Sequence, residues 1–145
     1  MSLSEWVAHG WVVPHAAGRE EIGDLLGVVD RDLADATAAR LSADWRLNIA
    51  YNAALQAATA ALAAWGFRAA RESHHYRVIQ SLRHTLGWDK SRISQFDRFR
   101  KKRNIGGYER AGMVSDIEAK EMLQLAERLR AEVTDWLRAN HPNLL

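Results

Sequence analysis

The feature that most constrains the fold of this chain is the absence of proline between Pro14 and Pro142. The stretch between them is rich in alanine, leucine and arginine, which are good helix formers, and proline would have interrupted a helix. Apolar residues recur within it at steps of three and four, as on one face of a helix. This period predicts helices near residues 19–40, 43–65, 73–86, 90–103 and 115–139.

These segments predict an all-α fold, an up-and-down helical bundle of about five helices. A chain of 145 residues is one domain by length. We expect the bundle domain over residues 19–145. An irregular N-terminal arm over residues 1–18 precedes it and is expected to lie against the bundle or a partner subunit. No strand-like alternation or hairpin signal of any length is visible.

Side chains that can cap a helix stand at several of the predicted starts. The predicted caps are Ser42, Ser73, Asp89 and Ser115, the last of which forms a capping box with Glu118. Residues 53–64 are dense in alanine, so this helix is expected to pack closely against its neighbours at the centre of the bundle. The charged residues of the 19–40 segment are expected on its solvent-exposed face: Asp30, Arg31, Asp32 and Asp35.

Composition excludes several classes of site. The chain has no cysteine, hence no disulfide framework and no thiolate metal site. No apolar run approaches the roughly 20 residues that span a bilayer, and no secretion signal is visible. We therefore expect a cytoplasmic protein with no membrane segment, no metal and no cofactor.

The adjacent His74 and His75 would point about 100° apart on a helix, so each is expected to be a structural or surface residue rather than a metal ligand.

Basic charge is concentrated in one third of the chain. Residues 71–114 hold eleven basic and four acidic residues, a net charge of +7, whereas residues 1–70 and 115–145 carry −3 and −2. Crowded lysines and arginines repel one another, so this pattern indicates an anionic ligand: phosphate, nucleic acid or an acidic protein. The predicted nucleic-acid-binding residues are Arg98, Arg100, Lys101, Lys102 and Arg103.

The basic run leads directly into Asn104, Gly106, Gly107 and Tyr108. Two consecutive glycines allow the backbone to leave a helix through conformations that a side chain would forbid. An arginine at such a helix end can hold a phosphate through two parallel hydrogen bonds, and an asparagine can bind a phosphate oxygen or a ribose hydroxyl. The spacing places Arg103, Asn104 and Tyr108 together at this helix end as candidate site residues.

The segment Arg103-Asn104-Ile105-Gly106-Gly107-Tyr108 resembles the arginine–polar–x–x–x–histidine/tyrosine signature of HEPN domains. The resemblance covers a core of about residues 42–139. It implies a small helical bundle, usually a homodimer, that binds RNA or nucleotide. It also implies a component of a toxin–antitoxin pair, with a nucleotidyltransferase-like or antitoxin partner. Many members of the group are metal-independent ribonucleases or their inactive relatives.

One position departs from the nuclease members, which carry histidine where this chain has Tyr108. A histidine pKa lies near working pH, whereas an ordinary tyrosine has a pKa of about 10 and is a poor base. Tyr108 can still donate a hydrogen bond or stack on a base. Phosphate binding is therefore better supported than cleavage, although an active ribonuclease using Arg103, Asn104 and Tyr108 remains one of the hypotheses.

A third hypothesis is a helix-turn-helix DNA-binding protein. Residues 78–86, Gly87 and residues 90–103 resemble two short helices around a glycine turn, the second of them basic. A recognition helix of this kind should present its polar residues to DNA, with Arg92 and Gln95 outermost. In the HEPN-like alternative, Arg103 and Tyr108 should instead line a cleft, with Arg98, Lys101 and Lys102 at its rim.

Overall fold

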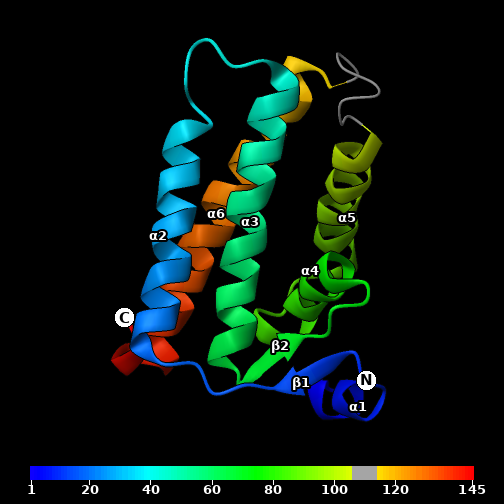
Figure 1. Ribbon diagram of the computed structural model, residues 1–145, viewed down its shortest axis with the longest axis vertical. Helices are drawn as coiled ribbons and strands as arrows, with labels where there is room; N and C mark the ends of the chain where they lie inside the picture. The colour runs from blue at the N-terminus through cyan, green and yellow to red at the C-terminus, as the bar shows by residue number, and fades with distance from the viewer. Residues whose placement is uncertain (106–113) are drawn as a thin grey trace.

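The computed structural model describes residues 1–105 and 114–145, and the side chains of residues 104 and 105 are not described. Over these ranges the chain is an all-α bundle, as the sequence predicts. Figure 1 shows α2, α3 and α6 side by side, with α5 on the other side of α3. The helices are α1 (Leu3–Ala8), α2 (Arg19–Asp35), α3 (Ala43–Ala64), α4 (His74–Thr85), α5 (Lys90–Ile105) and α6 (Asp116–Asn140). A 3-10 turn at Pro142–Leu144 follows α6.

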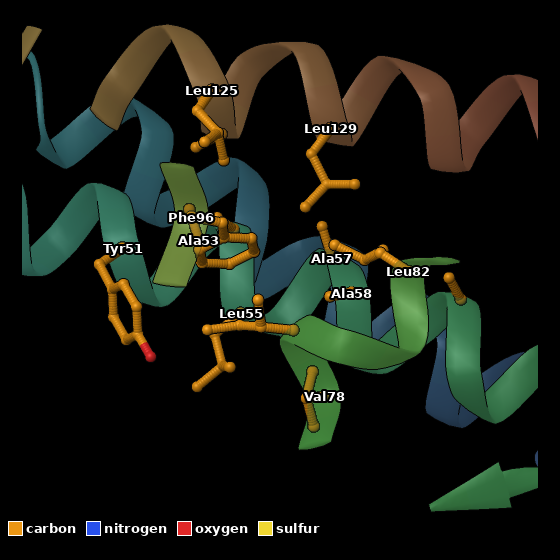
Figure 2. Close-up of a cluster of buried hydrophobic side chains, with 14 of the residues drawn as sticks. Tyr51, Ala53, Leu55, Ala57, Ala58, Val78, Leu82, Phe96, Leu125 and Leu129 are labelled. Atoms are coloured by element: carbon orange, nitrogen blue, oxygen red, sulfur yellow. The ribbon is translucent and has the colours of Figure 1, made fainter. Parts of the chain in front are cut away.

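Helix α3 is the centre of the bundle and packs against α2, α4, α5 and α6. Eight of its alanines are buried, and these small side chains let the neighbouring helices approach closely. Figure 2 shows the larger side chains of other helices around this surface, among them Phe96 of α5 and Leu129 of α6. The expected close packing of the alanine-rich segment is confirmed.

Three of the predicted helix caps are confirmed. The hydroxyl oxygen of Ser42 accepts from the Trp45 amide, and the Asp89 carboxylate accepts from the Arg92 amide. Ser115 and Glu118 form both hydrogen bonds of a capping box. The prediction for Ser73 is wrong: its side chain makes no capping hydrogen bond, because its backbone is in the left-handed region with φ 54°.

Two expectations about the first long helix are corrected. Helix α2 ends at Asp35 rather than at residue 40, and the Thr37 hydroxyl donates to the Ala34 carbonyl where the chain turns away. Asp32 is not on the solvent-exposed face but only 5% exposed. Its carboxylate accepts hydrogen bonds from Asn52 Nδ2 of α3 at 2.7 Å and from Arg31 Nε at 3.0 Å, which compensate for burying the charge.

The N-terminal arm is more ordered than the sequence pattern indicated. It contains α1 and a strand β1 (Val12–Pro14), which pairs antiparallel with β2 (Phe67–Ala69) after α3. This short two-stranded sheet forms although the sequence shows no strand-like alternation or hairpin signal. The arm is fixed to the bundle by the Arg77 guanidinium of α4, which lies 3.7 Å from the centroid of the Trp11 ring.

No helix within the described residues is both long enough and apolar enough to cross a membrane.

Candidate functional site

The basic helix α5 is held to the bundle by one apolar face. Ile93, Phe96 and Phe99 are buried, as their spacing predicts. The basic residues that follow them differ in exposure: Arg98 and Lys101 are exposed, whereas Arg100, Lys102 and Arg103 are half-buried. The positive charges are thus distributed over more than one side of α5.

Acidic neighbours offset only some of these charges. Asp97 accepts from Arg100 Nε at 2.7 Å and lies 3.6 Å from Lys101 Nζ. Lys102 Nζ lies 3.4 Å from a carboxylate oxygen of Glu118 in α6. Among the described residues, no carboxylate lies within ion-pair distance of Arg98 or Arg103. These two guanidiniums keep hydrogen-bonding capacity for an anionic ligand.

Arg103 lies against an aromatic side chain of α3. Its guanidinium carbon is 5.2 Å from the centroid of the Tyr51 ring, a distance typical of a cation–π contact. Tyr51 is 1% exposed. Burial raises the pKa of its hydroxyl to about 12, even though the charges of Arg103 and Arg100 act in the opposite direction. Tyr51 is therefore a neutral phenol at physiological pH.

The hydroxyl of Tyr51 contacts a histidine that the sequence predicts to be a structural or surface residue. Tyr51 Oη lies 3.2 Å from Nδ1 of His75, the second residue of α4. Burial lowers the pKa of His75, and the positive charge of Arg103 lowers it further. His75 is therefore a neutral imidazole near pH 7. Contacts from α3, α4 and α5 thus connect Tyr51, His75 and Arg103.

A surface hollow of about 410 Å³ lies next to this group, where α4 begins beside α5. It is lined by Arg71, Ser73, His74, His75, Tyr76 and Arg100. No carboxylate is among these lining residues. A second hollow, of about 350 Å³, lies between α5 and α6 and is lined by Gln95, Arg98, Phe99, Lys101, Lys102, Glu118 and Glu121. The two hollows differ in electrostatic character, because only the second includes acidic side chains.

The structure places the predicted site residues in different surroundings. Arg100 and Arg103 adjoin the Tyr51–His75 contact, whereas Arg98, Lys101 and Lys102 line the hollow between α5 and α6. Asn104 belongs to α5, but its side chain is not described, and Tyr108 lies outside the described residues.

Sequence reasoning did not identify Tyr51 and His75 as site residues. The sequence predicts His74 and His75 to be structural or surface residues, because metal binding was the only functional role weighed for them. The available signal was the His-His-Tyr-Arg run at a helix start, close in sequence to the basic segment. Within residues 1–105 and 114–145, no cluster of three or more histidine, aspartate or glutamate side chains could hold a metal ion.

One of the two residues required by the helix-turn-helix alternative, Arg92, has partners within the protein itself. Arg92 donates from both terminal nitrogens to Glu132 of α6, at 2.9 and 2.8 Å. Its guanidinium also lies 3.9 Å from the centroid of the Trp88 ring. Arg92 and Gln95 are both half-buried, so neither is outermost as the helix-turn-helix alternative predicts.

The fold and site define an all-α bundle whose basic helix borders a hollow lined by arginine, histidine and tyrosine. No protein-family model, curated protein or solved structure matches this chain.

Proposed function

We propose that this protein is an HEPN-like module that binds RNA or nucleotide through α5 and the adjoining start of α4. The observation that carries the proposal is the pairing pattern of the basic side chains. Arg98 and Arg103 have no carboxylate partner among the described residues, and Arg100 borders a hollow whose lining is free of acid. Arg100 also lies against the half-buried Tyr76 ring, and an arginine beside an accessible aromatic ring suits a phosphate and a base together.

A second candidate is the metal-independent ribonuclease activity that the HEPN resemblance implies. It is favoured by His75, which is neutral near pH 7 and close to Arg103. If the ring instead carries its proton on Nδ1 and donates to the Tyr51 oxygen, the free Nε2 can act as a general base, the role for which Tyr108 is poorly suited. A toxin–antitoxin role with a nucleotidyltransferase-like or antitoxin partner rests on the resemblance alone.

The salt dependence of RNA binding tests the binding proposal. We expect a triple variant, Arg98→Gln with Lys101→Gln and Lys102→Gln, to bind a single-stranded RNA oligonucleotide more weakly. The slope of log affinity against log salt should become shallower by about 2, because each phosphate contact on a single strand contributes roughly 0.7. The measurement is fluorescence anisotropy of labelled RNA at several salt concentrations.

A matched triple variant controls for net charge. Arg40, Arg68 and Arg83 are exposed arginines outside α5, and their replacement by glutamine removes the same formal charge. The control should retain the wild-type slope to within about 0.5. The proposal is contradicted if the two triple variants change the slope equally, or if the wild-type protein binds no RNA or nucleotide. Gel analysis of the metal-free samples tests the ribonuclease candidate.

We also infer a homodimer. Two large apolar side chains are exposed at one end of the bundle, Trp45 of α3 (63%) and Ile117 of α6 (71%). They flank the ion pair between Arg46 and Asp116, and Figure 1 shows the last turn of α5 at the same end. Aromatic residues commonly anchor protein interfaces. Sedimentation equilibrium should show a dimer at micromolar concentration, and a species of 16.4 kDa alone would contradict it.

A further inference from the structure

We propose that the hollow at the start of α4 binds a phosphate monoester, the group carried by a free nucleotide or by the end of an RNA chain. For convenience we call it the α4–α5 hollow, lined by Arg71, Ser73, His74, His75, Tyr76 and Arg100. The inference rests on the proposed function, because that function supplies nucleotides as the ligand class. The inference goes beyond that function because it assigns the phosphate monoester of the ligand to the α4–α5 hollow.

The guanidiniums of the α4–α5 hollow have donors to spare. Arg100 uses Nε to bind Asp97, and its two terminal nitrogens donate to no partner among the described residues. Arg71 is exposed, and no carboxylate among the described residues pairs with it. Because an arginine carries five N–H donors in a fixed planar arrangement, two such side chains can together contact several oxygens of one phosphate.

His75 adds a neutral donor to these charged ones. The Tyr51 hydroxyl stays protonated, and Nδ1 of His75 is the acceptor within its reach among the described residues. With Nδ1 accepting from Tyr51, the proton of the neutral ring resides on Nε2. His75 lines the hollow, so Nε2–H can donate to a phosphate oxygen without the ring being charged. Tyr51 is thus a positioning residue for His75.

The volume of the hollow and the charge of its arginines favour a terminal phosphate of RNA over an internal one. A volume of about 410 Å³ lies near the lower limit of ligand sites, which span roughly 300–1,000 Å³, and suits one nucleotide. A monoester has a second pKa of about 6, so it approaches a charge of −2 at pH 7.5, whereas an internal diester carries −1. Arginine donors in a hollow without acidic lining should therefore prefer the monoester.

The test compares RNA oligonucleotides of one sequence that differ only at their ends, using the 145-residue chain at pH 7.5. The probes carry a 5′-phosphate, a 3′-phosphate or hydroxyls at both ends. One phosphorylated form should bind about tenfold more tightly than the hydroxyl form, as expected for one added charge-assisted contact. Competition by a nucleoside 5′-monophosphate, but not by the nucleoside, would identify the free nucleotide as a ligand; its failure would identify the RNA end.

The variants are judged by one ratio: the affinity for the tighter-binding phosphorylated oligonucleotide divided by the affinity for the hydroxyl form. A general loss of RNA binding lowers both affinities and cancels in this ratio. Arg71→Gln and His75→Gln should each reduce the ratio to about threefold or less. Tyr51→Phe, which keeps the ring and removes the hydroxyl, should reduce it in part. Arg68→Gln on β2, an exposed arginine that does not line the hollow, should leave the ratio unchanged. Thermal melting of each variant confirms that it is folded.

Three negative results have different meanings. If the wild-type protein binds all three oligonucleotides with equal affinity, the terminal-phosphate inference is overturned while the proposed RNA-binding function stands. If Arg71→Gln and His75→Gln both retain the full ratio, the phosphate is bound elsewhere and the assignment to the α4–α5 hollow is overturned. If no RNA or nucleotide binds, the proposed function itself fails.

Discussion

Replacing Phe96 with alanine is expected to lower the free energy of unfolding by about 3–5 kcal/mol, the usual cost of deleting a buried aromatic ring. Phe96 is 0% exposed and packs edge-on to the Tyr51 ring, with 5.8 Å between ring centroids. It also lies 6.4 Å from the Trp88 ring. Urea unfolding followed by circular dichroism measures the change, since one domain of this size should unfold in a single transition.

Two further variants define what the Phe96 result means. Phe96→Leu keeps most of the buried volume and should cost less than half as much as the alanine variant. Ile117→Ala truncates a side chain that is 71% exposed and should change stability by less than about 0.5 kcal/mol. A loss below about 1 kcal/mol for Phe96→Ala would contradict the packing described for α5. Because Phe96 supports Tyr51, the stability variant should also disturb the contact between Tyr51 and His75.

The helices could be predicted because their signals are local. Apolar residues at steps of three and four place α3, α5 and α6 to within one or two residues of the observed bounds. The caps at Ser42, Asp89 and Ser115 depend only on residues up to three positions away.

The features that were missed depend on residues far apart in the sequence. Strands β1 and β2 are three residues each and pair Val12 with Ala69, so neither is long enough to show alternation. Asp32 resembles a solvent-exposed charge until α3 supplies Asn52 as a partner. No local rule distinguishes such a residue from its exposed neighbours.

The candidate site likewise has one part that could be predicted from the sequence and one part that could not. The basic residues of α5 were identified from the sequence, since crowding of charge is visible there. Their division between two hollows was not, because it depends on which side of α5 faces α6 and which faces the start of α4. The contact between Tyr51 and His75 joins residues 24 positions apart and exists only because α3 packs against α4.

Arg103→Ala is expected to weaken RNA or nucleotide binding by roughly tenfold or more, whereas Lys101→Ala should weaken it by about two- to threefold. Arg103 is half-buried, is positioned over the Tyr51 ring and has no carboxylate partner among the described residues. The Lys101 side chain is 65% exposed and already lies 3.6 Å from Asp97. A positioned guanidinium can hold a phosphate through paired hydrogen bonds, but a mobile ammonium contributes mainly charge.

Binding titrations at two salt concentrations separate these roles, because the Lys101 variant should change mainly the salt dependence. A second measurement needs no ligand. The positive charge of Arg103 lowers the pKa of His75, so Arg103→Ala should raise the pKa of His75. NMR titration of the His75 imidazole measures this change. Lys101→Ala serves as the control and should change it less, since the exposed ammonium is screened by solvent. Equal effects of both variants on binding would mean that residues 98–103 form only a diffuse basic patch. The motif hypothesis for Arg103 should then be abandoned.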